Sequence, residues 1–284
     1  MKITANIRKF LKNALSEDIG KVDITTETLF SDDFLITAHL ITRQFCILAG
    51  IDLFKEIFLI LDKKTCFHKC VSDGARLKAG STVCVIKGRA KSILTGERVA
   101  LNMVSHLSGI ATYTNEFVMA TDGRFKILDT RKTLPGLREF EKYAVRIGGG
   151  YNHRMNLSEM VLIKDNHINL WAKHRGTNRS DAIRQLTSRA KKKLKLVVEV
   201  EVESFEESMV AMESGADIIM FDNTGISEIK KFLSHCGENR PLIEVSGGIE
   251  LSDIKKLKEI DIDFVSLGKI THSAPAVDFS LEIL

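Results

Sequence analysis

The sequence has no long apolar run and few tyrosines and tryptophans. No segment approaches the roughly 18 consecutive apolar residues that a membrane-spanning helix needs, and the N-terminus lacks the apolar core of a signal peptide. The chain has one tryptophan, three tyrosines and a net charge of only +4. No basic stretch is interleaved with aromatic residues that could stack on bases. These absences argue against membrane and nucleic-acid binding, and we expect a cytoplasmic protein.

The sequence also lacks the cysteine pattern that a disulfide framework requires. The five cysteines are odd in number and scattered, so we expect reduced thiols. Cys66, His68 and Cys70 are spaced like half of a metal site, but no second pair follows at zinc-ligand spacing. An ordinary strand or loop is therefore favoured there.

The 284 residues, 44% hydrophobic and 27% charged, suit one large domain or two ordinary ones. The first hundred or so mix a short helix, Ile7 to Leu15, with alternating and turn-rich segments, which predicts an α+β unit. Its segment GARLKAGSTVCVIKG is hairpin-like, as in a swinging-arm carrier domain. The exposed Met-Lys dipeptide that such a carrier modifies is absent from the turns of this segment, which favours a small supporting sheet. A long helix is expected next, over ILTGERVALNMVSHLSGIATYTNEFVMA, with Gly109 as a candidate break.

From Phe125 onward, short apolar runs alternate with helical segments. The runs are FKILDT, MVLIKD, LVVEVEV, ADIIMFDN, PLIEVSGG and DFVSLGK, each about as long as a buried parallel strand. A capping box at Ser204 and Glu207 opens one of the intervening helices. Strand and helix in alternation require a parallel sheet, and six or more repeats predict a closed or nearly closed α/β barrel. A doubly wound sheet is the alternative.

Polar residues follow each apolar run, where an α/β barrel places its active site. Glu199 and Glu201 share one face of a strand whose other positions are valine, so at least one carboxylate is expected inside the barrel or at its rim, near a lysine or a metal. The glycine-rich ends VSGG and SLGK suit phosphate, because glycine lets backbone N–H groups approach an anion. Carboxylates beside phosphate sites indicate a phosphorylated substrate with Mg²⁺.

The segment between Asp129 and His167 is rich in cations. Arginine suits bidentate carboxylate binding and lysine supplies compact charge, so cations beside a phosphate site indicate a substrate with further carboxylates. Lys142 and Arg146 are four residues apart in a helical stretch and are expected on its surface or paired with nearby glutamates. The cations that fall at element ends are Arg131, Lys132, His153, Arg154 and Lys164.

Several of these motifs are specific. The segments TRKTLPGLREFEKYAVRIGGGYNHR, MVLIKDNH, EVEVES, GADIIMFDN, EVSGGI and VSLGKITHS strongly resemble the quinolinate phosphoribosyltransferases, also called nicotinate-nucleotide pyrophosphorylases. The N-terminal ALSEDIGKVDITTETLF and LTGERVALNMVSHLSGIAT are similar to the family's N-terminal domain and linking helix, so the resemblance covers nearly the whole chain. It implies an α/β fold, with an N-terminal α+β sandwich at residues 1–110 and an incomplete α/β barrel at residues 111–272. Residues 273–284 would pack back on the sandwich.

The resemblance also implies the chemistry. The phosphoribosyl group of phosphoribosyl pyrophosphate (PRPP) would pass to quinolinate with decarboxylation, giving nicotinate mononucleotide, pyrophosphate and CO₂ in NAD biosynthesis. Lys132, Glu201 and Asp222 would be catalytic, and the two carboxylates would meet Mg²⁺, directly or through PRPP and water. The protein would act as a homodimer or a multiple of dimers, with Arg98 reaching in from the partner subunit. The substrate-binding residues would be Arg98, Thr130, Arg131, Lys132, His153, Arg154, Lys164, Glu201, Asp222, Ser246, Gly247, Gly248, Gly268 and His272.

The chain departs from the family pattern at two uncharged positions. Val22 stands where glycine is more frequent, and Ile147 where cysteine is frequent. The stretch WAKHRGTNRSD, within residues 168–181, resembles loop variation. A related group associated with molybdenum transport shares TRKT and GGG-x-x-HR but departs around IKDNH, which is intact here. That group and a non-catalytic phosphate-binding paralogue are the alternatives.

Overall fold

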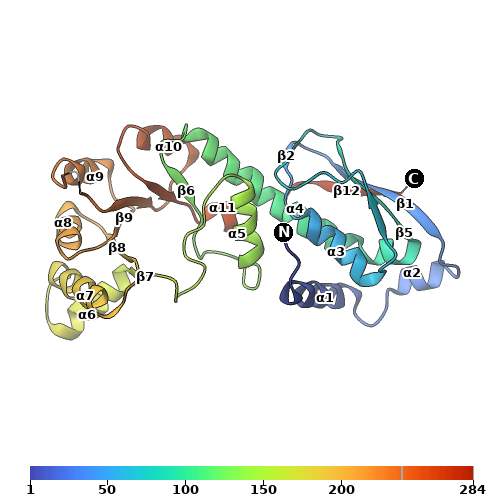
Figure 1. Cartoon of the computed structure of the whole chain (residues 1–284), viewed down its shortest axis with the longest axis horizontal. Coiled ribbons are helices and arrows are strands. Elements are labelled where there is room, and N and C mark those ends of the chain that lie inside the picture. Colours follow the sequence, from blue (N-terminus) through green and yellow to red (C-terminus); the bar gives the residue numbers. More distant parts are fainter. Residues whose placement is uncertain (238, 284) are drawn as a thin grey trace. The chain divides into compact units, whose positions relative to one another are not determined.

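The computed structural model describes residues 1–237 and 239–283 and divides the chain into two compact units. The first unit comprises residues 1–115, 139–149 and the segment from Ser273 onward, and the second comprises residues 116–138 and 150–272. Figure 1 shows the helices and strands of both units. No helix among the described residues is long and apolar enough to cross a lipid bilayer.

The first unit contains a four-stranded antiparallel sheet with helices. Its elements are α1 (Ala5–Ile19), α2 (Ile24–Leu29), β1 (Leu35–Thr42), β2 (Cys46–Ile47), α3 (Ile51–Leu61), β3 (Cys66–His68), β4 (Arg76–Leu77), β5 (Thr82–Arg89), most of α4 (Ala90–Ala120), most of α5 (Arg138–Ile147) and β12 (Phe279–Ile283). The strand order is β12-β1-β5-β3. In α1, the residues Ile7, Leu11 and Leu15 are buried at a spacing of four, which is the apolar stripe of an amphipathic helix. Strand β12 pairs with β1, so the end of the chain completes the sheet of the N-terminal segment.

Helix α4 is continuous through Gly109, so this glycine is not a break. A methyl group at position 109 would lie 2.2 Å from the carbonyl oxygen of Pro275. The glycine is therefore required by the close approach of the segment after Ser273 to the helix. Lys142, expected on the helix surface or paired with a nearby glutamate, is fully buried in α5.

Two of the cysteines expected to be reduced are joined in a disulfide, Cys70 to Cys84. The backbone N–H of Val71 donates to the carbonyl of Val83 at 2.9 Å. This bond brings Cys70, which precedes Val71, opposite Cys84, which follows Val83. Sequence spacing does not report such cross-strand neighbours. Cys66, the first residue of the suspected metal half-site, is free and exposed.

The second unit contains a six-stranded parallel sheet, and its strands are the six apolar runs. Its elements are β6 (Lys126–Leu128), β7 (Val161–Ile163), α6 (Asp165–Arg175), α7 (Arg179–Lys193), β8 (Val198–Val202), α8 (Phe205–Glu213), β9 (Ile218–Asp222), α9 (Ile226–Leu233), β10 (Leu242–Ser246), α10 (Leu251–Leu257), β11 (Phe264–Ser266) and α11 (Lys269–His272). All five residues of β8 are buried, which explains why its positions are valine apart from the two glutamates. Figure 1 shows helices α6 to α9 along one side of strands β7 to β9.

The strand order β6-β11-β10-β9-β8-β7 settles the choice of architecture. Successive strands are neighbours and β6 returns beside β11, as in a barrel, whereas a doubly wound sheet reverses its order in the middle. Among the described residues, no pairing closes the sheet between β6 and β7. The predicted incomplete α/β barrel is confirmed. Residues 168–181, interpreted as loop variation, are mostly helical: Asn178 caps α7 by accepting the N–H of Asp181 at 2.8 Å.

Candidate active site

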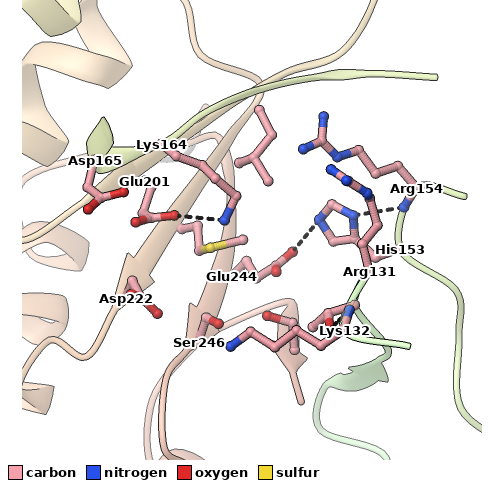
Figure 2. Close-up of a pocket in the computed structure, with 14 residues that line it drawn as sticks. Arg131, Lys132, His153, Arg154, Lys164, Asp165, Glu201, Asp222, Glu244 and Ser246 are labelled. Carbon is pink, nitrogen blue, oxygen red and sulfur yellow. Dashed lines mark hydrogen bonds and ion pairs between the residues drawn. The ribbon is translucent and has the colours of Figure 1, made fainter. Parts of the chain in front are cut away.

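A cavity of about 430 Å³ lies at the carboxyl ends of the parallel strands (Figure 2). The strand register brings five of its lining residues together: Glu201 pairs with Met220, Met220 with Glu244, and Asp222 with Ser246. Because strand residues alternate between faces, residues two apart on neighbouring strands point into the same cavity. The residues expected from the sequence that line it are Thr130, Arg131, Lys132, His153, Arg154, Lys164, Glu201, Asp222 and Ser246.

The predicted glycines lie in the loops that follow β10 and β11. Gly248 lines an adjoining cavity of about 250 Å³ together with Ser246 and Asn223. Gly247 has a φ of +124°, and a methyl group there would lie 2.5 Å from Oδ1 of Asn223, so only glycine fits. At Gly268, which precedes α11 and His272, a methyl group would lie 2.7 Å from the Cδ atom of Lys132. The remaining predicted residue, Arg98, is on α4 in the first unit.

Four cationic side chains give the cavity its character. Arg131 and Arg154 are neighbours, and burial together with the charge of Arg131 lowers the pKa of Arg154. The Nε of Arg131 is buried and has no hydrogen-bond partner in the described part of the chain. With Lys132 and Lys164 in the same cavity, four cationic side chains line it. A small molecule with two carboxylates complements this arrangement.

Two carboxylates stand among these cations. Glu201 is largely buried, and its Oε2 accepts a hydrogen bond from Nζ of Lys164 at 3.3 Å. Of the two partners that the sequence left open for this strand, the structure therefore provides a lysine. Asp222 ends β9, and its Oδ2 accepts from the side-chain amide of Asn223 at 3.1 Å. The cavity thus has anionic as well as cationic groups to offer a substrate.

The KDNH motif holds one of the cations in place. Lys164 precedes α6, and its backbone N–H donates to Nδ1 of His167 at 3.0 Å. Asp165 lines the cavity beside it. The motif is therefore a helix start that fixes the backbone of a cationic residue.

Beneath the cations lie three buried groups, His153, Glu199 and Glu244. Nε2 of His153 is 2.9 Å from Oε2 of Glu199 and 3.8 Å from Oε2 of Glu244. Burial raises the pKa of each glutamate to about 8. One ligand atom from each residue lies within 4.8 Å of the others, so the cluster has the dimensions of a metal site.

Among the residues of this region that the predicted site lacked are Glu244 and Asp129. Glu244 lines the cavity, and it could have been found because it lies two residues before Ser246 on the same face of β10. Asp129 is buried directly after β6 and accepts the backbone N–H of His153 at 2.9 Å. Its signal was its position, since it is the first polar residue after an apolar run.

Comparison with known proteins agrees with this geometry. Residues 23–108 match the family model of the quinolinate phosphoribosyl transferase N-terminal domain, and residues 110–282 match that of the C-terminal domain. The chain is 38% identical over 282 residues to a probable carboxylating nicotinate-nucleotide pyrophosphorylase of Bacillus subtilis (strain 168), covering 98% of this chain and 93% of the relative. It is 35% identical over 284 residues to the carboxylating nicotinate-nucleotide pyrophosphorylase of Mycobacterium leprae (strain TN), covering 97% and 96%.

Solved structures give the same result. NadC from Streptococcus pyogenes has a TM-score of 0.91 and 40% identity, covering 100% of this chain and 99% of that one. The nicotinate-nucleotide pyrophosphorylase from Francisella tularensis has a TM-score of 0.89 and 38% identity, covering 100% and 98%. Both domains and nearly the full length are matched. The chain belongs to the quinolinate phosphoribosyltransferase family.

Proposed function

We propose that this protein transfers the phosphoribosyl group of PRPP to quinolinate and releases CO₂ and pyrophosphate, forming nicotinate mononucleotide. The observation that carries the proposal is the group of four cations in one small cavity, with the Nε of Arg131 left without a partner. A planar ring with two adjacent carboxylates would satisfy them. The names of the relatives support the same reaction. The intact KDNH motif, with Lys164 and Asp165 in the cavity, favours quinolinate over the molybdenum-associated alternative.

The reaction needs charge stabilisation rather than a covalent nucleophile. The ring nitrogen of quinolinate would attack C1 of the ribose as pyrophosphate leaves, through a transition state in which the sugar is positively charged. Glu201 and Asp222 would favour that positive sugar, and Lys132, which would face both substrates, would favour the leaving pyrophosphate. Such preorganised groups contribute roughly 3 to 4 kcal/mol each. The quaternised ring then accepts the electron pair when the adjacent carboxylate departs as CO₂.

We also propose that Glu201 and Asp222 meet the Mg²⁺ that accompanies PRPP. Their chemistry fits, because Mg²⁺ is typically held by one or two carboxylates together with phosphate oxygens and water. The bound ion would neutralise charge on the pyrophosphate. The loops around Gly247, Gly248 and Gly268 would receive the 5′-phosphate through backbone N–H groups, with His272 nearby.

The proposal includes a homodimer in which Arg98 completes the partner's site. It rests on the match of the N-terminal segment and linking helix to the family. Arg98 lies on that helix, α4.

Product formation tests the function directly. Purified protein with quinolinate, PRPP and Mg²⁺ should form nicotinate mononucleotide and CO₂ in equal amounts. Nicotinate in place of quinolinate is the matched control, because it lacks the carboxylate that leaves, and it should be used far more slowly. A folded protein that forms no product from quinolinate would refute the proposal.

A further inference from the structure

His153 lines the cavity, but both of its ring nitrogens are engaged within the protein. Nδ1 accepts the backbone N–H of Arg154 at 2.7 Å, and Nε2 lies 2.9 Å from Oε2 of Glu199. Because Nδ1 is the acceptor, the ring proton is on Nε2 and is donated to Glu199. The imidazole is therefore held as one neutral tautomer that fixes the backbone of Arg154. Figure 2 shows the bond between the ring and Arg154 at the edge of the cavity.

Glu199 accepts this hydrogen bond from the interior of the sheet. Its side chain is completely buried on β8, and its Oε1 has no hydrogen-bond partner in the part of the chain that the structure describes. A buried carboxyl group with an unpartnered oxygen costs folding free energy that an apolar side chain would not. Its hydrogen bond goes to a cavity residue, which indicates a role in the site rather than in stability.

The cations of the cavity need such support before a ligand arrives. Arg131 and Arg154 carry like charges at close range, and burial together with repulsion by Arg131 lowers the pKa of Arg154. The segment that carries Arg154 is fixed at two backbone N–H groups: Asp129 accepts that of His153 at 2.9 Å, and the His153 ring accepts that of Arg154. Side chains held in the bound geometry beforehand bind more tightly, because less order has to be created on binding.

The same arrangement occurs on the other side of the cavity. His167 accepts the backbone N–H of Lys164, and Nζ of Lys164 bonds Glu201, which lies two residues after Glu199 on β8. One strand therefore presents one carboxylate toward each cation, directly for Lys164 and through a histidine for Arg154. Residues two apart share a strand face, so both glutamates point to the same side of the sheet: Glu201 lines the cavity, and Glu199 is fully buried next to His153.

We infer that Glu199 is a positioning residue: through His153 it fixes Arg154 in the orientation that pairs with a carboxylate of quinolinate. The inference rests on the proposed function, since it takes quinolinate as the ligand. The inference specifies which chemical group is needed at position 199. An oxygen acceptor must be present there, whereas a negative charge is not required, because the donor is the neutral Nε2–H group.

Two substitutions separate these requirements. Glu199→Gln keeps the size and an acceptor oxygen, and Glu199→Leu removes the acceptor. Binding of quinolinate to the ligand-free protein is measured by titration calorimetry, and KM is measured for both substrates. For Glu199→Leu, we expect the quinolinate Kd and KM to rise at least about 10-fold, as for loss of a buried hydrogen bond to a binding group. The KM for PRPP and all values for Glu199→Gln should stay within about threefold of the wild type.

Stability distinguishes this role from a structural one. Replacing a poorly satisfied buried carboxyl group by leucine should leave the melting temperature unchanged or raise it, while quinolinate binding weakens. ¹⁵N NMR of histidine-labelled protein, with the His153 signal assigned by His153→Gln, should show a single Nε2–H tautomer in the wild type and a mixture in Glu199→Leu. If Glu199→Leu does not fold, Glu199→Met replaces it in the same measurements.

Three outcomes would overturn the inference. Wild-type affinity for quinolinate in Glu199→Leu would show that position 199 does not act on the site. Equal loss in Glu199→Gln and Glu199→Leu would show that the charge is required. One equivalent of bound zinc or manganese in the wild type, absent from Glu199→Leu, would assign His153, Glu199 and Glu244 to a metal site. A wild-type protein that converts no quinolinate refutes the proposed function instead. In that case the NMR comparison still tests the hydrogen bond between His153 and Glu199, because it does not require activity.

Discussion

The carboxyl group of Glu244 should make the ligand-free protein less stable as the pH rises. The side chain is buried on β10, and neither of its oxygens has a hydrogen-bond partner among the described residues. Burial is the main reason that its pKa rises from 4.5 to about 8, and the neighbouring charge of Glu199 adds to the effect. The folded protein therefore keeps a proton on Glu244 at a pH at which the unfolded chain has lost it.

The sign and size of the effect follow from this difference. Between pH 4.5 and about 8 the folded state binds more protons than the unfolded state, so the free energy of unfolding falls as the pH rises. One pKa unit corresponds to about 1.4 kcal/mol, so the window sets a ceiling of roughly 5 kcal/mol. Glu199 titrates in the same range and interacts with Glu244, so the share removed by changing one residue is smaller, about 2 to 4 kcal/mol.

Urea denaturation of the wild type and Glu244→Gln at about pH 5 and about pH 8 measures this share. The buried amide adds a cost that does not depend on pH, so the relevant quantity is the change in the difference between the two proteins. That difference should move in favour of Glu244→Gln by about 2 to 4 kcal/mol over the interval. Glu213→Gln, which replaces an exposed carboxylate on α8, is the control and should run parallel to the wild type. Parallel curves for Glu244→Gln would refute the raised pKa.

Further predictions concern backbone packing and subunit sharing. Gly109→Ala should lower the free energy of unfolding by at least about 2 kcal/mol, because its methyl group meets the carbonyl of Pro275. Gly225→Ala, whose methyl group would make only an ordinary contact with Oγ of Ser227 at 3.5 Å, should change it by less than about 1 kcal/mol, and urea denaturation compares the two variants. Lys164→Ala should lower kcat/KM for quinolinate at least about 100-fold in a product assay, without a fall in melting temperature. Arg98→Ala should also be inactive and folded. Exchange of subunits between these two variants should restore some turnover, and continued inactivity of verified mixed dimers would contradict a shared site.

The architecture of the second unit was predictable because its signals are local. A strand buried on both faces gives an apolar run, and the residue after each run lies at the carboxyl edge of the sheet, where the cavity formed. Arg131, Lys164 and Asp222 were found in this way. Strands β7 to β11 lie in sequence order, as the rule that consecutive parallel units are neighbours leads one to expect, and β6 lies beside β11.

What the sequence did not reveal depends on neighbours that are distant in the chain. The pairing of Cys70 with Cys84 comes from the hydrogen-bonded backbone between them, and Lys142 is buried although its helical spacing suited a surface. Glycine at position 109 suggested a helix break from local propensity alone. It is required instead because Pro275, more than 160 residues later, lies too close for a larger side chain. Local propensity cannot distinguish these cases, because the deciding contact is absent from the local sequence.

Glu199 and Glu201 show how far a face can be predicted and where the prediction ends. They have the same chemistry and the same face, so the sequence could state only that at least one of them points inward. Cross-strand register separates them: Glu201 is level with Met220 and Glu244 beside the cavity, and Glu199 is level with Ile218, one step deeper. At that depth Glu199 meets His153 rather than Lys164, and its pKa rises with burial. The role of an acidic residue in this sheet is therefore set by its distance from the carboxyl end of its strand, which requires the register of the neighbouring strands.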